Sequence, residues 1–258
     1  MATETSTHQS IDRAITVLRV LNQTPTGLRV AEVAKITGLG ASTTSRLLAV
    51  LESQDFVLRD ESTGVYRLGS ALITLGGTAL NQRPVYREGR SVAQRLARTL
   101  DLGTSLAARR TDALFYFCSF EGAGGSKQWN SMGQTGPLHA TALGKCLVCE
   151  FDPGERRELL GDLQAYTSHT VVDHEALDAE LAQVRRQGYA IERQELALGR
   201  ACVAALIRDA DGEICGSLSV SGSLSAVGLP DREAELAGIV IEAADEISIG
   251  LGFRAAPS

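Results

Sequence analysis

The sequence predicts a mixed α/β chain of the α+β class, and three observations predict it. Residues 28–68 contain two short helical patterns separated by a tight turn and followed by a hairpin pattern. Ser70–Leu80 (SALITLGGTAL) is an apolar, helix-like stretch with a soft point at Gly76-Gly77. The remaining residues alternate strand-like and helix-like segments, as in a mixed sheet flanked by helices. We therefore expect an N-terminal domain over residues 1–69, a linker helix over 70–83 and a C-terminal domain over 84–258.

The first helices are predicted by apolar residues that recur every three or four positions. Residues 10–22 and Val30–Thr37 each place such residues on one face, and Gly38-Leu39-Gly40 ends the second pattern. A third helix over Ala41–Gln54 buries its leucines, and it turns a polar group outward: Ser42, Thr43, Thr44 and Arg46. Two short helices joined by a glycine-containing turn, the second with an exposed polar start, are typical of helix-turn-helix DNA-binding proteins.

A hairpin directly after the third helix is an independent requirement of a winged helix-turn-helix. Phe56–Asp60 and Val65–Leu68 are β-rich runs around a glycine-containing turn. Hydroxyls at the start of the third helix suit phosphates or base edges, and Arg46 suits guanine or a phosphate. We expect Arg29 at the helix entry, and Arg59 and Arg67 on the wing, to contact the DNA backbone. The alternative is that the Ser-Thr-Thr run only caps the helix and that Arg46 is a solvated charge.

Composition limits the classes of partner. The chain has 258 residues, of which 44% are hydrophobic, enough for two domains. Residues 1–80 hold seven basic and seven acidic residues, so the remainder carries the whole net charge of −6. An acidic body disfavours nonspecific DNA coating and anionic membranes. No apolar run approaches the roughly 18 residues of a membrane span, and Met1–Gln9 lacks the apolar core of a signal peptide.

The five cysteines form an odd set in a large chain, which indicates a reducing cytoplasm rather than a disulfide framework. Cys146 and Cys149 make one isolated CxxC inside an apolar helical run. Structural zinc needs about four ligands, so we interpret both as buried thiols and expect neither metal nor cofactor.

The C-terminal elements follow from alternation, apolar runs and turn residues. Pro84 suits the first turn of a helix, and Asp211-Gly212 suits a turn between the last two strands. The expected strands are Thr104–Arg109, Ala113–Phe120, Tyr189–Glu192, Ala201–Arg208 and Ile214–Ser221. The expected later helices are Ala142–Glu150, Pro153–Leu160, Asp173–Gln187 and Pro230–Leu251.

Motifs in a fixed order along nearly the whole chain resemble the IclR family of bacterial transcriptional regulators. They are Ser10–Ala14, Gly64–Gly69, Pro137–Lys145 (PLHATALGK), Gly188-Tyr189, Glu195 ahead of Gly199–Ala205 (GRACVAA), and Leu218–Gly222. The resemblance implies a winged helix-turn-helix, a linker helix and a GAF-like effector-binding domain. It also implies double-stranded operator DNA and a small-molecule effector as partners, and homodimers that often pair into homotetramers.

The family's effector pocket carries over position by position. The resemblance assigns to it Ala142 and Leu143 at the start of a helix, Glu192 at a strand end, Cys202, Ser219 and Ser221. Residues two apart on a strand share a face, so both serine hydroxyls can reach one ligand. The N–H groups at the start of the Ala142 helix can add donors to a carboxylate.

Two departures from the family pattern stand out. Gly40-Ala41 replace a common proline and basic residue, which implies one phosphate contact fewer, and Leu206 replaces a common proline at the pocket edge. Other interpretations of the pocket residues stay open. Cys202 can be core filler, Glu192 a solvated carboxylate, His139 a structural hydrogen-bonding group, and the serines from Ser217 to Ser223 an exposed strand face.

The function we infer is a ligand-responsive transcriptional regulator, with repression expected at a pseudo-palindromic operator and a small organic-acid-like metabolite as effector. The alternative is an enzyme with a GAF-like catalytic domain. No GxSxG motif occurs, however, and His169 and His174 lack an identifiable nucleophile, so we assign no catalytic residue. A third interpretation, a scaffold that dimerises without ligand, requires a filled region around Ser219 and Ser221.

Overall fold

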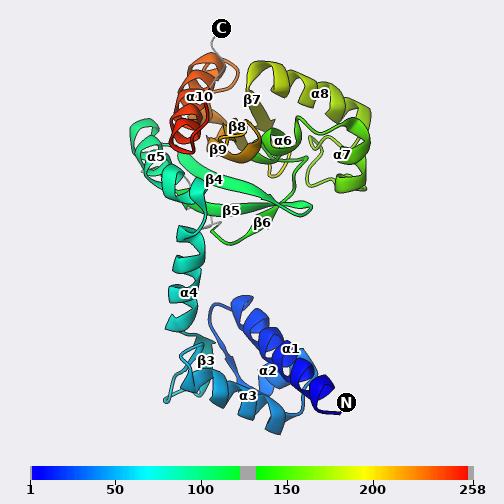
Figure 1. Ribbon diagram of the computed structural model, residues 1–258, viewed down its shortest axis with the longest axis vertical. Coiled ribbons are helices and arrows are strands. Elements are labelled where there is room, and N and C mark those ends of the chain that lie inside the picture. Colours follow the sequence, from blue (N-terminus) through cyan, green and yellow to red (C-terminus); the bar gives the residue numbers. More distant parts are fainter. Residues whose placement is uncertain (1, 123–131, 255–258) are drawn as a thin grey trace. The chain divides into compact units, whose positions relative to one another are not determined.

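The computed structural model describes residues 2–122 and 132–254, with side chains described from residue 9 onward. The chain divides into two compact units, Met1–Leu80 and Asn81–Ser258 (Figure 1). The helix predicted as a linker thus groups with the N-terminal unit. Within the described residues, no helix is long and apolar enough to cross a lipid bilayer.

The N-terminal unit is a helical domain with a small antiparallel sheet of order β1-β3-β2. Its elements are α1 (Ala2–Asn22), β1 (Leu28–Arg29), α2 (Val30–Thr37), α3 (Ala41–Ser53), β2 (Val57–Arg59), β3 (Val65–Leu68) and α4 (Ser70–Asn81). Strand β3 pairs with both others, Tyr66 lying opposite Leu28 on one side and Arg59 on the other. Val17, Val33 and Leu48 are fully buried in the core between the helices and the sheet. The predicted helices and wing are therefore confirmed.

Two details of this unit differ from the expectation. Helix α1 begins at Ala2, well before the apolar pattern that starts near Ser10, and β1 adds a third strand that the sequence did not indicate. Helix α4 is the helix expected there, and it runs without interruption through Gly76-Gly77. Two glycines weaken a helix by backbone entropy but do not block its hydrogen bonds.

The C-terminal unit is built on one six-stranded antiparallel sheet of order β6-β5-β4-β9-β8-β7. The strands are β4 (Gly103–Arg110), β5 (Ala113–Phe120), β6 (Thr135–Gly136), β7 (Tyr189–Arg193), β8 (Arg200–Arg208) and β9 (Ile214–Ser223). The helices are α5 (Pro84–Leu100), α6 (Ala142–Val148), α7 (Pro153–Leu160), α8 (His174–Gln187), α9 (Leu224–Val227) and α10 (Glu233–Gly250).

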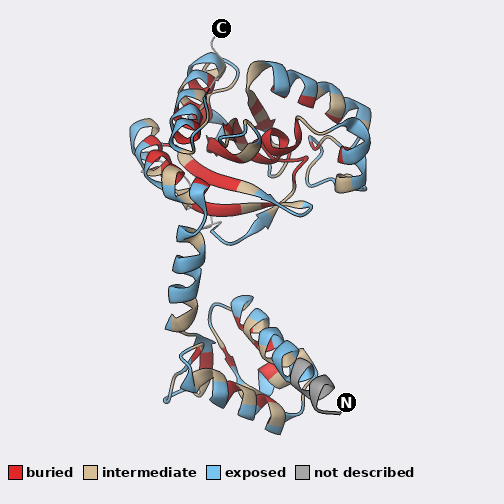
Figure 2. Cartoon of the chain, viewed as in Figure 1, coloured by how far each residue is buried: buried red, intermediate tan, exposed pale blue. Residues whose placement is uncertain are grey.

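Helices cover both faces of this sheet. Helices α5 and α10 pack together on one face, where Gly89 of α5 lies so close to Leu106 of β4 that an added Cβ would lie 2.7 Å from the leucine side chain. Helices α6 and α8 cover the other face, where Cys146 and Leu181 join a core with Ala204. Figure 2 shows the buried residues concentrated along the strands and the helix sides that meet them. This sandwich of helix, sheet and helix positions the candidate site described below.

The predicted strands and helices of this unit are all present, with shifted ends. Helix α6 ends at Val148 instead of Glu150, and α10 begins at Glu233 instead of Pro230. Strand β6 and helix α9 were missed, because two and four residues are too few to show a periodic pattern.

Candidate functional site

The tight turn between α2 and α3 depends on Gly38. Its φ of 70° lies in the left-handed region, which glycine adopts without steric cost, and it ends α2. Leu39 then turns back and packs against the core of the N-terminal unit. Helix α3 can thereby start at Ala41 with a fixed direction relative to α2.

Helix α3 presents a small polar surface. Ser42 and Arg46 are exposed, and Thr43 is half-buried. Thr44 corrects the expectation, because it is fully buried and its hydroxyl donates to the Gly40 carbonyl at 3.2 Å. The hydroxyl of a threonine that donates to the carbonyl four residues earlier is occupied by a hydrogen bond within its own helix. Thr44 is therefore not available to DNA.

Two other exposed residues of α3 were missed by the sequence reasoning. Ser45 is exposed beside Arg46, and Val50 lies one turn further along with 64% of its surface exposed. The spacing of three residues from Ser42 to Ser45 could have identified the serine. An exposed valine on such a helix suits a thymine methyl group.

The three other predicted arginines are exposed and held in place by the wing and its neighbours. Arg29 donates from Nε to the Thr63 carbonyl at 3.1 Å, and Arg67 donates from Nε to the Thr26 carbonyl at 3.2 Å. The Arg59 guanidinium lies over the Tyr66 ring, 5.8 Å from its centroid. Each arginine keeps further N–H donors for a phosphate.

In the C-terminal unit, a polar face runs from β9 across β8 to the edge strand β7, beneath α6. Ser221 lies opposite Cys202, and Cys202 lies opposite Glu192, so these three side chains share one face. Ser219 follows two residues before Ser221 on the same face. All four are buried, with exposed fractions of 5% or less. The alternatives of a solvated Glu192 and an exposed serine face are therefore wrong, although Ser223 at the strand end is exposed.

Helix α6 covers this face closely. Gly144 lets the segment before α6 pack against the helix, since an added Cβ would lie 2.3 Å from the Leu138 carbonyl oxygen. Thr141 caps the helix by accepting from the Gly144 N–H at 3.0 Å, and Ala142 and Leu143 are buried in the first turn. One of the N–H donors expected for a ligand is thus already used by the cap.

A buried ionic network lies next to Glu192. The Glu192 carboxylate accepts from the backbone N–H of Glu195 at 2.7 Å and of Leu196 at 3.3 Å. Lys145 of α6 is fully buried and donates to Glu195 at 2.6 Å and to Glu180 of α8 at 2.7 Å. Burial raises the pKa of Glu192, and it raises the pKa of Glu195 to about 6 even though Lys145 acts in the opposite direction.

A cavity of about 580 Å³ adjoins this polar face. Its lining comprises Asp112, Ala113, Tyr116, Gln134, Thr135, Gly136, Pro137, Tyr166, Leu196 and Arg200. The six predicted pocket residues are not among them. Arg200 makes the connection, because it lines the cavity and donates from Nη2 to Ser221 Oγ at 3.1 Å. The sequence reasoning missed Arg200, although it stands two residues before Cys202.

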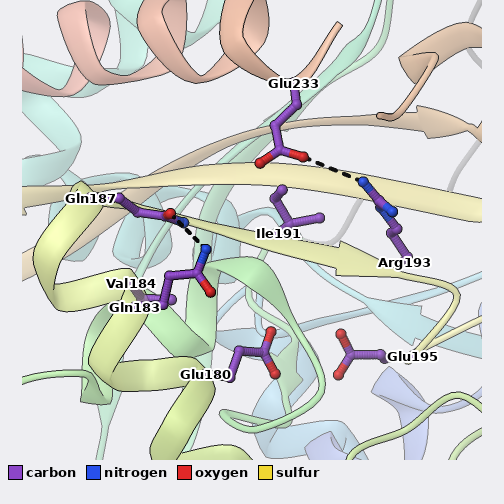
Figure 3. Close-up of a pocket in the computed structure, with 8 residues that line it drawn as sticks. All are labelled: Glu180, Gln183, Val184, Gln187, Ile191, Arg193, Glu195 and Glu233. Carbon is purple, nitrogen blue, oxygen red and sulfur yellow. Dashed lines mark hydrogen bonds and ion pairs between the residues drawn. The ribbon is translucent and has the colours of Figure 1, made fainter. Parts of the chain in front are cut away.

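A second, smaller hollow of about 310 Å³ lies between α8 and the outer side of β7 (Figure 3). Glu180 and Glu195 point toward one another across it, and Arg193 pairs with Glu233 at 3.4 Å. Glu195 Oε2 is buried without a hydrogen-bond partner. Glu195 Oε1 accepts from Lys145. Glu195 therefore belongs both to the wall of this hollow and to the ionic network beside the polar face.

The cysteines and histidines have structural contacts. Burial raises the pKa of Cys146, and that of Cys149 to about 11, so both stay protonated thiols. His139 donates from Nε2 to the Gln164 carbonyl at 2.9 Å, and His174 does the same to Gly161 at 2.9 Å. Over residues 9–122 and 132–254, no three histidine, cysteine, aspartate or glutamate side chains gather as metal ligands.

Comparison with known proteins identifies both units. The family description "Bacterial transcriptional regulator IclR C-terminal" matches residues 77–249, and "IclR helix-turn-helix domain" matches residues 10–61. The HTH-type transcriptional regulator XynR of Escherichia coli is 30% identical over 252 residues, which cover 96% of this chain and 98% of XynR. The HTH-type transcriptional repressor AllR of Klebsiella pneumoniae is 29% identical, over 95% of this chain and 91% of AllR.

Solved structures show the same architecture. An IclR transcriptional regulator from Alicyclobacillus acidocaldarius has a TM-score of 0.81 at 29% identity, covering 95% of this chain and 99% of that one. An IclR homolog from Microbacterium hydrocarbonoxydans, solved in complex with 4-hydroxybenzoate, has a TM-score of 0.82 at 24% identity, covering 94% and 98%. The second likeness is one of fold alone. With a winged helix-turn-helix and a helix-covered sheet that both match one family, the chain belongs to the IclR family of bacterial transcriptional regulators and is not an enzyme.

Proposed function

We propose that this regulator is a repressor that binds a pseudo-palindromic operator as a homodimer, or as a pair of dimers, and responds to a small organic acid bound at the polar face under α6. The observation that carries the proposal is the cavity beside that face, which Arg200 connects to Ser221. We place the protein in the cytoplasm, together with its DNA.

The DNA contacts are proposed for the exposed residues of α3 and the wing. Ser42 and Arg46, with half-buried Thr43, are the candidates for base and phosphate contacts on α3. Arg29, Arg59 and Arg67 are exposed with donors to spare, and they are the candidates for phosphate contacts beside it. Thr44 is buried and therefore cannot contact DNA.

Dimerisation is supported by α4. The helix carries no charged residue and no buried one (Figure 2). Ile73 and Leu75 on it are 78% and 55% exposed. An apolar helix that buries none of its side chains needs a partner surface. A single N-terminal unit, with equal numbers of basic and acidic residues, also makes few phosphate contacts, since single DNA-binding modules bury only about 600–1,000 Å². A second copy of α4 meets both requirements.

The effector role is supported by the polar side chains that are buried on the face under α6. Ser219 and Ser221 are buried polar groups, and Glu192 shares their face with a raised pKa. Ser221 accepts from Arg200, which lines the cavity, and polar groups that reach a cavity wall in this way are typical of ligand sites. The ligand changes DNA binding only if it binds one arrangement of the dimer better than the other.

A gel shift on the DNA upstream of the chain's own gene tests the proposal. Arg46→Ala should weaken operator binding by about 1–3 kcal/mol, with relaxed sequence preference if Arg46 contacts a base. Arg19→Ala, which removes an exposed arginine of α1, is the matched control and should leave binding unchanged. Full affinity of the Arg46 variant would contradict the assignment of α3, and a footprint with one unpaired half-site would contradict the dimer.

A further inference from the structure

Arg200 is a cation with an unmet hydrogen-bond donor at a cavity wall. It is the first residue of β8, its side chain is half-buried, and Nη2 donates to Ser221 Oγ at 3.1 Å. Its Nε is buried and has no hydrogen-bond partner. A buried donor without a partner costs free energy that a ligand acceptor can recover.

Arg200 also forms no ion pair with a carboxylate among the described residues. Buried Lys145 and Arg156 each have a carboxylate partner, Glu195 and Asp178 respectively. Among the described residues, no carboxylate oxygen lies within ion-pair distance of the Arg200 guanidinium. Glu192, the acid of the neighbouring polar face, instead accepts from the backbone N–H groups of Glu195 and Leu196.

The walls around Arg200 indicate what kind of anion fits. Tyr116, Tyr166, Leu196 and Pro137 present rings and apolar surface to the cavity. A single guanidinium next to a buried glutamate suits one negative charge and disfavours a dianion such as a phosphate monoester. The cavity of about 580 Å³ falls within the usual range for small ligands, roughly 300–1,000 Å³.

We propose that Arg200 binds the carboxylate of a small monocarboxylic acid, through Nε and Nη2, while the apolar body of the acid packs against Tyr116, Tyr166 and Leu196. Nε and Nη2 lie on one edge of the guanidinium, the geometry of a two-bond pair with a carboxylate. Ser221 accepts from Arg200 and keeps its own proton to donate to the same carboxylate. The inference rests on the proposed effector site and adds the residue that selects the ligand class.

Calorimetric titration of the full chain with matched acids and amides tests the assignment. The probes are benzoate, 4-hydroxybenzoate and hexanoate, each paired with its primary amide, which keeps the shape and removes the charge. We expect at least one acid to bind wild type about tenfold or more tighter than its amide, because bonds to charged groups exceed neutral ones. Arg200→Gln should abolish the preference for the acid over its amide. Arg200→Lys should keep only part of this preference, because a lysine ammonium lacks the planar guanidinium that binds a carboxylate through two N–H groups.

Arg193→Gln is the matched control, since Arg193 lies at the end of β7, pairs with Glu233 and lines the other hollow. It should retain the full acid preference. Thermal unfolding of each variant without ligand verifies that it is folded. The assignment is overturned if no acid binds better than its amide, or if Arg200→Gln keeps the preference.

A parallel gel shift separates this inference from the proposed function. If a neutral amide releases the protein from DNA and no acid binds more tightly than its amide, the proposed effector response is supported and the proposed role of Arg200 is wrong. If the acid preference depends on Arg200 but no acid changes DNA binding, Arg200 stands as the acid-binding residue and the proposed response is wrong.

Discussion

The two faces of the C-terminal sheet are built from alternate residues of the same strands, yet they differ in chemistry. On β9, Leu218 and Val220 are fully buried on the face under α5 and α10. Ser217, Ser219 and Ser221, which alternate with them, are buried on the face under α6. The face under α6 also holds an apolar core, which includes Leu147 and Leu181, so it combines hydrophobic packing with a row of buried polar groups from β9.

The polar face remains stable because its groups find partners. Ser217 donates to the Ala205 carbonyl at 2.9 Å, and the Ser105 and Ser119 hydroxyls are 2.9 Å apart. Lys145 lies between two carboxylates. Three buried side-chain atoms of the described residues lack a partner: His174 Nδ1, Glu195 Oε2 and Arg200 Nε. Glu195 and Arg200 border the polar face and line hollows, so a ligand or water can reach them there.

The largest effect should come from breaking the ionic network of the polar face. Lys145→Met leaves Glu195 buried without its cation, and we expect the free energy of unfolding at pH 7.5 to fall by about 3–5 kcal/mol. Denaturant unfolding followed by circular dichroism measures it. Lys35→Met, at an exposed lysine of α2, is the control and should have little effect. A fall below 1 kcal/mol would mean that water already solvates the network.

A single truncation on the apolar face should be almost as costly. Leu218→Ala removes a fully buried side chain and should lower the free energy of unfolding by about 2–5 kcal/mol through lost contacts and a cavity. Ser217→Ala, its neighbour on the polar face, removes one hydrogen bond and should cost about 1 kcal/mol. Equal losses in the two variants, measured by the same unfolding experiment, would remove the distinction between the faces.

The elements of both faces could be predicted from the sequence because their signals are local. Alternation along Ile214–Ser221 placed the serines on one side and Leu218 with Val220 on the other, and the register confirms this. The helix-turn-helix followed from apolar spacing and from Gly38. These patterns depend on residues within a few positions of one another.

What the sequence could not provide was long-range pairing. Lys145 and Glu195 are separated by 50 positions, and Arg200 meets Ser221 across a strand pair. Thr44 was placed wrongly because a hydroxyl bonded to the carbonyl four residues earlier resembles an outward polar residue in the sequence. Burial and tertiary contacts decide such cases.

The pH dependence of stability should distinguish a carboxyl group whose pKa is raised by burial, Glu195, from one whose pKa is lowered by a hydrogen bond, Glu150. The folded-state pKa of Glu195 is raised by burial from 4.5 to about 6, so its stabilising contribution is complete below 4.5 and is lost as pH rises through 6. We expect wild type to lose about 2 kcal/mol relative to Glu195→Gln between pH 4.5 and 7.5. Unfolding free energies of both proteins at several pH values in that range measure the difference.

Glu150 provides a control of opposite sign. A hydrogen bond from Arg208 lowers the pKa of Glu150, so its contribution is present at neutral pH and is lost as pH falls below its ordinary value of 4.5. Relative to Glu150→Gln, wild type should therefore lose stability toward acid. If both comparisons changed in the same direction, burial could not be the dominant influence on Glu195.

The smallest expected effect is on ligand binding, and it tests the function of the polar face rather than its stability. Ser219→Ala combined with Ser221→Ala should weaken the acid that binds wild type most tightly by about tenfold, because two hydrogen-bonding hydroxyls are lost. DNA binding without ligand should be unchanged, since both residues lie in the C-terminal unit while the proposed DNA contacts are in α3 and the wing. Ser217→Ala removes a hydroxyl from the same strand and face but one already bonded to Ala205, so it should bind the acid normally. Calorimetry and gel shift on all three proteins measure both properties. Normal acid binding by the double variant would place the ligand elsewhere, and loss of ligand-free DNA binding would make the serines structural.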